Sequence, residues 1–199
     1  MNTSNYEIRA KARDALGNNI FDRTWLLALA AGLIISVIIA AATSIGGIAS
    51  ILLTGPLYVG LHFTFLKIAR KDIDIKFENV FAGCYSFGPN LVLGLMHNLL
   101  ITLWTFLFII PGIIKGYSYS MAYFIKADHP EYGWRECLQE SERLMKGNRL
   151  RLFSLHLSFI WWDILGIMTC GIGTLWVSAY KSTANAIFYE ELKRSDMYN

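Results

Sequence analysis

The stretch PGIIKGYSYSMAYFIK, residues 111–126, decides how the rest of the chain is interpreted. Its apolar run is short for a membrane-spanning helix, and it carries a lysine, three tyrosines and two serines where lipid favours leucine. The dipeptide Pro111-Gly112 is a turn signal, and a proline is tolerated in the first turn of a helix. We therefore expect a membrane helix over residues 113–126 that lies inside a helix bundle.

The composition on both sides of this stretch is that of a membrane protein. Of the 199 residues, 54% are hydrophobic and 17% are charged, whereas about 25% of residues in soluble domains are charged. The charges are clustered, and the apolar runs between them approach the roughly 20 residues that cross a bilayer. Residues 1–199 are expected to form a single membrane domain.

The apolar runs and the amphipathic segments alternate along the chain. Six runs predict membrane helices at about residues 25–42, 48–68, 91–110, 113–126, 152–168 and 174–189. Three shorter segments with apolar residues at helical spacing predict amphipathic helices at about residues 4–16, 76–87 and 132–146. The expected fold is an all-α membrane protein of six transmembrane helices in three hairpins, each preceded by a short cytoplasmic amphipathic helix. Two explanations of this pattern are open: a true structural repeat, or the common tendency of helices to end at Gly or Asn.

The distribution of basic residues predicts the orientation. Sixteen of the 18 Lys and Arg residues lie in the segments that precede, follow or link the hairpins, and the other two are Lys115 and Lys181. By the positive-inside rule, both termini and the three amphipathic helices face the cytoplasm. A cleaved signal peptide over residues 1–42 is the less favoured reading, because its first part is long and contains acidic residues. Topology thus explains the net charge of +3, and no nucleic-acid partner is expected.

Apart from Lys67 and Lys126 at the cytoplasmic ends of two spans, three charges fall inside the predicted spans: Lys115, Asp163 and Lys181. Because a charge at the bilayer centre costs about 2.5 to 3.5 kcal/mol, each should have a partner, and either lysine could pair with Asp163. One interpretation is a substrate or ion site. The other, which we prefer because a partner is at hand, is an ion pair with snorkelling lysines that orders the helices.

Polar residues at helical spacing surround these charges. The candidate intramembrane polar site consists of Lys115, Ser118, Tyr119, Asp163, Ser178, Lys181 and Asn185. Such residues could line a wet cavity, but small and hydroxylated residues are also how membrane helices pack, and Gly112-x-x-x-Gly116 fits that use. We prefer packing, because no face is dense in charge.

Little in the sequence points to catalysis. The four histidines have no ligand spacing, the three cysteines (Cys84, Cys137 and Cys170) form no metal or disulfide pattern, and hydrolase, metalloprotease and P-loop motifs are missing. The polar run Asp128-His-Pro-Glu131 is interpreted as the turn that ends a helix. No cofactor and no metal is expected.

The second half of the chain resembles a known family. The residues that carry the resemblance are Ile110-Pro111-Gly112-Ile113-Ile114-Lys115, Tyr117 to Ala122, Ser141 with Leu144 to Gly147, Leu157 to Ile160, and Phe188-Tyr189. With them the chain is similar to a family of bacterial integral membrane proteins whose function is unknown. The resemblance implies a multi-pass protein of the bacterial cytoplasmic membrane and brings no reaction or catalytic residue. Asp163 and Lys181 replace apolar or small residues of the family pattern, so a site built on them is not expected throughout the family.

Two functional hypotheses follow, with a membrane enzyme as a distant third. The first is a non-catalytic membrane protein whose amphipathic helices rest on the lipid bilayer or dock a membrane-protein partner or a second copy of the chain. The alternative is a small permease or channel, which requires that the polar faces enclose one water-accessible cavity.

Overall fold

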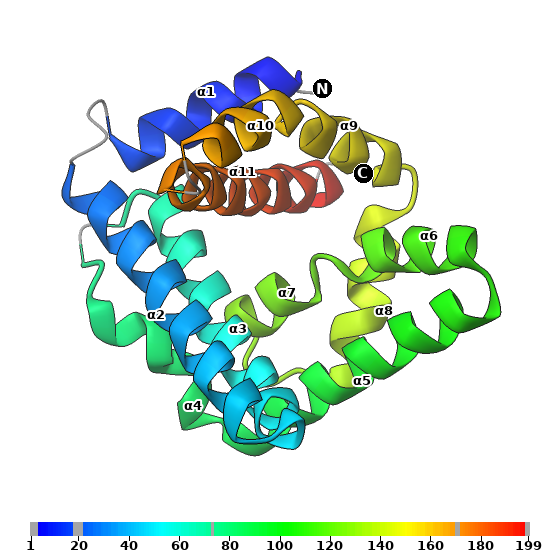
Figure 1. Ribbon diagram of the computed structural model, residues 1–199. Coiled ribbons are helices and arrows are strands. Elements are labelled where there is room, and N and C mark those ends of the chain that lie inside the picture. Colours follow the sequence, from blue (N-terminus) through cyan, green and yellow to red (C-terminus); the bar gives the residue numbers. More distant parts are fainter. Residues whose placement is uncertain (1–3, 18–21, 73, 170–171, 198–199) are drawn as a thin grey trace.

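The computed structural model describes residues 4–17, 22–72, 74–169 and 172–197, and every regular element in these ranges is a helix (Figure 1). In chain order the elements are α1 (Asn5–Leu16), α2 (Arg23–Ile45), α3 (Gly47–Ala69), the 3-10 helix η1 (Phe77–Phe81), α4 (Ala82–Tyr85), α5 (Phe87–Leu107), α6 (Ile109–Tyr119), α7 (Ala122–Asp128), α8 (Trp134–Met145), α9 (Arg149–Leu157), α10 (Ile160–Met168) and α11 (Ile172–Met197).

Among the described residues, four helical stretches are long and apolar enough to cross a membrane. They are Arg23–Ser44, Ala49–Ala69, Phe87–Leu107 and Arg149–Met168. The all-helical class is therefore confirmed. The predicted spans at 113–126 and 174–189 are not among these four stretches, so six spans stay a prediction. Along the chain α2 packs against α3, α5 against α6 and α10 against α11, but their organisation as three membrane hairpins also stays a prediction.

Helix α3 is the central helix of the molecule, because it contacts α1, α2, α4, α5, α7 and α11. Its approach to α5 depends on two glycines. A Cβ atom on Gly94 of α5 would lie 2.5 Å from the Cα atom of Gly55 in α3, so the two backbones are in direct contact. Small residues commonly bring apolar helices this close. The sequence analysis selected Gly112 and Gly116 for this role. Gly112 does pack closely against Thr105, whereas a Cβ atom on Gly116 would meet nothing within 4 Å.

The stretch that opens the sequence analysis forms two helices instead of one. Helix α6 ends at Tyr119 and α7 begins at Ala122. The side chain of Ser141 explains the break: its hydroxyl donates to the carbonyl of Ser118 (2.7 Å) and accepts from the backbone N–H of Met121 (3.2 Å). Since the hydroxyl takes the place of a backbone partner in the helical ladder, it interrupts the helix. The sequence contains no proline or glycine at this position that would predict a break.

Helices α1 and α8 bury the apolar faces that the sequence predicts for them. In α1 the side chains of Ile8, Ala12 and Leu16 are fully buried, and the helix packs on α11 and α3. In α8 the buried face, which includes Cys137 and Ser141, contacts α5, α6 and α7. The protein's own helices therefore cover both faces, and the charged faces of α1 and α8 point outward.

The predicted amphipathic helix at 76–87 is irregular. It consists of η1 followed by a single turn of α-helix, α4. Val80 is buried, but Phe77, Tyr85 and Phe87 are exposed, Tyr85 to 86%. Of the three predicted amphipathic segments, this one exposes three aromatic side chains, whereas α1 exposes Tyr6.

Candidate functional site

The structure places Asp163 and Lys181 together. Lys181 Nζ on α11 lies 2.9 Å from Asp163 Oδ2 on α10, and both side chains are about one third exposed. Of the two partners that the sequence left open for Asp163, Lys181 is therefore the one observed. One turn further along α11, Asn185 Oδ1 lies 2.9 Å from Nε2 of His156, which extends the polar contacts to α9.

Lys115 has a different partner. Its ammonium donates to Glu142 Oε1 on α8 at 2.6 Å and lies over the rings of Trp104 and Tyr119, 5.5 and 5.4 Å from their centroids. These contacts place a cation where the faces of two aromatic rings attract it. The pairing follows from the course of α8, which turns back and runs antiparallel beside α7 and α6. The sequence predicts a cytoplasmic amphipathic helix over residues 132–146, and its side of the membrane stays a prediction.

The remaining candidate hydroxyl groups are bonded to their own helices. Ser118 is fully buried and its Oγ donates to the carbonyl of Ile114 at 2.7 Å, while Ser178 is exposed and donates to Leu175 at 2.7 Å. Tyr119 is buried with its ring 6.3 Å from that of His97. The seven predicted residues thus form two separate ion-paired groups, one with Asp163, Lys181 and Asn185 and one with Lys115 and Tyr119. The two serines stand apart from both groups.

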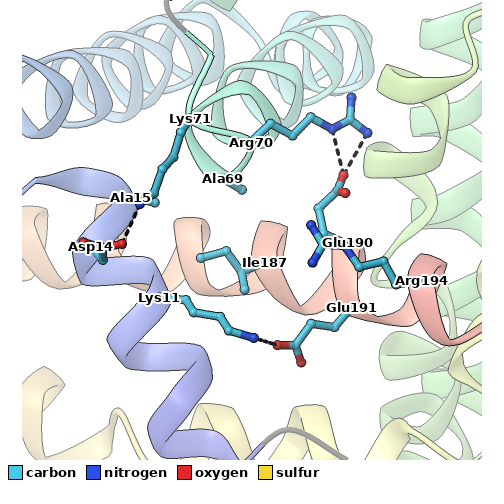
Figure 2. Close-up of a pocket in the computed structure, with 10 residues that line it drawn as sticks. All are labelled: Lys11, Asp14, Ala15, Ala69, Arg70, Lys71, Ile187, Glu190, Glu191 and Arg194. Carbon is cyan, nitrogen blue, oxygen red and sulfur yellow. Dashed lines mark hydrogen bonds and ion pairs between the residues drawn. The ribbon is translucent and has the colours of Figure 1, made fainter. Parts of the chain in front are cut away.

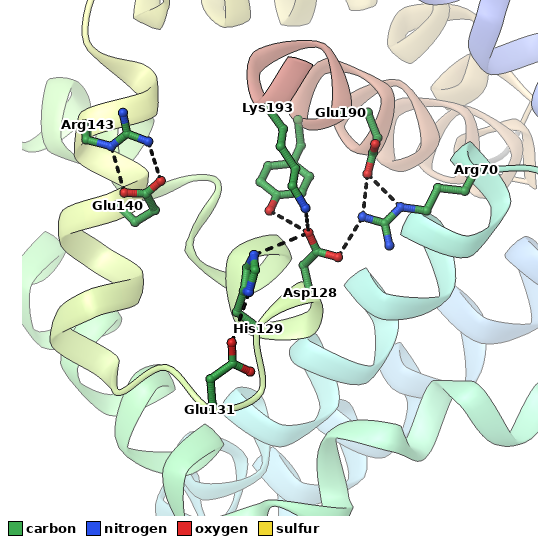
Figure 3. A network of polar contacts seen from close by, with 9 residues as sticks. Arg70, Asp128, His129, Glu131, Glu140, Arg143, Glu190 and Lys193 are labelled. Carbon is green, nitrogen blue, oxygen red and sulfur yellow. Dashed lines mark hydrogen bonds and ion pairs between the residues drawn. The ribbon is translucent and has the colours of Figure 1, made fainter. Parts of the chain in front are cut away.

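Asp128, at the C-terminal end of α7, is bonded to side chains at the ends of α3 and α11 (Figure 3). Arg70, which follows α3, donates to its Oδ1 at 2.7 Å. Its Oδ2 accepts hydrogen bonds from Lys193 and, at 3.3 Å, from the hydroxyl of Tyr189, both on α11. Arg70 also binds Glu190 at 2.8 Å. These residues, the Asp128 cluster, connect the ends of α3, α7 and α11.

The electrostatics of the Asp128 cluster keep Asp128 and Arg70 charged. Burial by itself would raise the pKa of Asp128, but hydrogen bonds from Lys193 and Arg70 outweigh it and hold the pKa below its ordinary value. Burial would likewise lower the pKa of Arg70, and its contacts with Asp128 and Glu190 raise it instead. The carboxylate side chain of Asp128 is only 10% exposed, whereas Arg70 and Lys193 keep more than a third of their side-chain surface exposed, so the cluster buries the acid but not its cations.

A cavity of about 320 Å³ lies beside this cluster, between α1, the end of α3 and α11 (Figure 2). Ion pairs cross it: Lys11 with Glu191 at 2.7 Å, Lys71 with Asp14 at 2.5 Å, and Arg70 with Glu190. Together with the Asp128 cluster, these pairs form a charged layer that joins α1, α3, α7 and α11.

The sequence analysis missed the Asp128 cluster, although a signal for it was present. The predicted spans at 48–68, 113–126 and 174–189 all end on the same side of the membrane in the predicted topology. The charges that directly follow them, Arg70, Asp128 and Glu190, are the residues that meet in the structure. Interpreting Asp128 only as part of a turn was correct for the backbone, since α7 ends there, but it overlooked the side chain.

The side chains offer no evident metal site. In residues 4–17, 22–72, 74–169 and 172–197, no group of three or more His, Cys, Asp and Glu is placed to hold a metal ion. Burial raises the pKa of the Cys137 thiol to about 11, so this cysteine is a protonated core residue. Cys170 lies outside the described residues.

Helices with apolar surfaces, packed around one central helix and joined by a charged layer, define an all-helical protein in which four stretches could cross a membrane. The chain belongs to the family described as protein of unknown function DUF975, whose model matches residues 1–115 and 106–196. This confirms the resemblance to a family of unknown function. No curated protein and no solved structure matches the chain.

Proposed function

We propose that this chain is a non-catalytic integral protein of the bacterial cytoplasmic membrane, which serves as a scaffold that binds a membrane-protein partner or a second copy. In this proposal the six predicted spans form three hairpins and both termini are cytoplasmic.

The observation that carries the proposal is the amount of large apolar surface left uncovered. Where α5 meets α6, Phe106 is 89% and Ile110 is 72% exposed, and on α10 Trp161 and Met168 are exposed to 75% and 77%. Soluble monomers rarely expose contiguous apolar patches of this kind, whereas hydrocarbon would solvate them favourably.

The charged layer supports the orientation and the scaffold role. The ends of α3, α7 and α11 meet in the Asp128 cluster, on the side where the positive-inside rule places the cytoplasm. The outward faces of α1 and α8 are charged, because their apolar faces are used for internal packing. A partner on this side would therefore meet charged and polar groups, and we expect its binding to weaken with ionic strength.

Labelling single cysteines in cells tests the orientation. In a background without the native cysteines, Gly46→Cys in the turn between α2 and α3 should react with a membrane-impermeant thiol reagent added from outside. Gly133→Cys, before α8, is the matched control and should react only after the membrane is opened. Reaction of Gly133→Cys in intact cells, or release of the protein from membranes by alkaline carbonate, contradicts the proposal.

A small permease or channel is the second candidate, because one cavity favours it. A cavity of about 420 Å³ lies between α2, α3 and α11, and Ser36, Ser178 and Ser182 contribute to its wall. The lysines that a polar pathway would use, Lys115 and Lys181, are both held in ion pairs. Reaction of Ser178→Cys with the impermeant reagent from both sides of the membrane would favour the permease.

A further inference from the structure

A smaller cavity is lined by residues of α3, α4, α5 and α7. It has a volume of about 150 Å³ and is formed where α3, α4, the start of α5 and the end of α7 meet. Its lining residues are Val59, Phe63, Ala82, Gly83, Ser86, Asn90, Lys126, Ala127 and Pro130. Two of them, Lys126 and Asn90, are buried polar residues whose hydrogen-bonding capacity is incompletely used.

Lys126 supplies a buried positive charge to this cavity. Its side chain is only 3% exposed, and its ammonium donates to the carbonyls of Pro130 (2.7 Å) and Tyr132 (2.6 Å). An ammonium has three N–H donors, so one remains. None of the ion pairs within the described ranges includes Lys126. A backbone hydrogen bond and, to a lesser extent, Lys126 lower the pKa of the Glu131 carboxyl. Glu131 is exposed, however, and none of these ion pairs joins it to Lys126, so an anion inside the cavity would stabilise the buried ammonium.

Asn90 supplies an acceptor without a donor. The residue is 2% exposed, and its Nδ2 donates to the carbonyl of Gly83 at 2.6 Å, which fixes the orientation of the amide. Its Oδ1 is buried and has no hydrogen-bond partner. Leaving a buried acceptor unpaired is unfavourable, so a ligand that donates a hydrogen bond to Asn90 Oδ1 would be favoured. The cavity therefore suits a group that carries both an anion and a donor.

The surroundings indicate where such a group would come from. Ser86, which lines the cavity and precedes the N-terminus of α5, lies between the exposed aromatic residues Tyr85 and Phe87. Exposed aromatic side chains of this kind are enriched at membrane interfaces, and a helix N-terminus favours an anion. Lys67 Nζ, 5.3 Å from the ring centroid of Phe63, adds a second positive charge nearby.

We propose that this cavity binds the head group of a phospholipid, with the phosphate at Lys126 and a terminal ammonium donating a hydrogen bond to Asn90 Oδ1. A phosphoethanolamine head group has this chemistry. A phosphocholine head group has the same phosphate and charge, but its trimethylammonium has no N–H to donate. The proposal that a lipid supplies this head group rests on the proposed membrane location. The chemistry by which the cavity would bind the head group does not depend on that location.

Thermal unfolding of the full-length protein in a non-ionic detergent tests the proposal. The probes are short-chain phosphatidylethanolamine, short-chain phosphatidylcholine and free phosphoethanolamine. At saturating concentration, phosphatidylethanolamine should raise the Tm by on the order of 5 °C and phosphatidylcholine by clearly less. Asn90→Leu should abolish the difference between the two lipids, and Lys126→Met should abolish the response to both. Lys146→Met removes an exposed lysine away from the cavity and should respond as the unmodified protein does.

Each result decides a separate point. Equal responses to the two lipids in the unmodified protein, or an unchanged difference in Asn90→Leu, overturn the proposal even if Lys126→Met fails to fold. If free phosphoethanolamine raises the Tm as much as phosphatidylethanolamine does, the ligand is a soluble phosphoryl compound and the proposal of a lipid is overturned. Because the assay is performed in detergent, a negative result leaves the orientation measured by cysteine labelling untouched.

Discussion

Helices α6 and α7 are consecutive parts of the stretch 111–126, yet they occupy opposite environments. On α6 the side chains of Ile110 and Ile113 are largely exposed, and the ion pair of Lys115 lies at the edge of the fold. On α7 all residues from Ala122 to Ala127 are buried, and the helix ends in the Asp128 cluster. The sequences of α6 and α7 are similarly polar, yet one helix is largely exposed and the other is buried. Packing against α3, α8 and α11 decides which of the two is buried.

The comparison also separates two kinds of ion pair. The side chains of Lys115 and Glu142 are 23% and 39% exposed. Exposed ion pairs contribute about 0 to 1 kcal/mol to the free energy of unfolding. Asp128 is nearly buried and has Arg70, Lys193 and Tyr189 as partners, so removing it leaves Lys193 without its carboxylate and Arg70 with Glu190 alone. We therefore expect the Asp128 cluster, at the end of α7, to contribute more to the free energy of unfolding than the pair of Lys115 and Glu142 on the α6 side.

The largest effect is expected for Asp128→Ala. It should lower the free energy of unfolding by about 3 kcal/mol, because Arg70 and Lys193 both lose a largely buried partner. The measurement is the Tm of the purified protein in detergent, with Asp128→Asn, which retains hydrogen-bonding capacity, as a milder variant. A Tm equal to that of the unmodified protein would show that the cluster is not a stabilising contact.

The boundary between α6 and α7 should depend on Ser141. Ser141→Ala leaves the buried carbonyl of Ser118 and the N–H of Met121 without their hydroxyl partner, which should cost about 2 kcal/mol. Ser120→Ala is the matched control, since the Ser120 hydroxyl bonds only to Tyr117 of its own helix. Equal stability of the two variants would mean that the break between the helices has another cause.

Lowering the pH should reduce the stability that the Asp128 cluster contributes to the folded protein. The pKa of Asp128 is lowered in the folded protein, so the unfolded chain binds more protons between the two pKa values and stability falls as the pH drops. The loss should begin near the ordinary carboxyl pKa of about 4 and continue below it. Unfolding curves recorded at decreasing pH should therefore decline less steeply for Asp128→Asn than for the unmodified protein. Parallel curves would exclude Asp128 as the titrating group.

The smallest effects are expected for the pairs outside the Asp128 cluster. Double-mutant cycles with Lys115→Met and Glu142→Gln, and with Lys181→Met and Asp163→Asn, should give coupling energies of at most about 1 kcal/mol. Couplings of 3 kcal/mol or more would place these pairs on the same level as the Asp128 cluster and reverse the comparison.

Much of the local structure could be predicted from the sequence. The amphipathic pattern at 4–16 predicts α1 to within a residue, and Ser4 caps it with Glu7 as a capping box. The pattern at 132–146 predicts α8 and its buried face equally well. The break at Ser120 and Met121 could not be predicted, because the side chain that causes it belongs to α8, about 20 positions later in the chain.

The candidate site was predictable only in part. A charge in an apolar run is recognisable from its immediate neighbours, which is how Lys115, Asp163 and Lys181 were selected. The partners of these charges could not be recognised from the sequence. Whether Lys115 pairs with Asp163 or with Glu142 depends on where α8 packs in the fold. For Asp128 the reverse holds: its neighbours in the sequence are those of an ordinary turn, and its partners come from α3 and α11.

The sequence by itself determined that this protein is helical, apolar and a member of one family, because hydrophobic periodicity and composition are local properties of the chain. Only the tertiary structure decided that α3 is central, that the stretch 111–126 breaks in two, and that Asp128 collects the charges at three helix ends. Those features depend on contacts between residues 20 to 120 positions apart, and the pattern of any single segment does not specify which distant segment will pack against it.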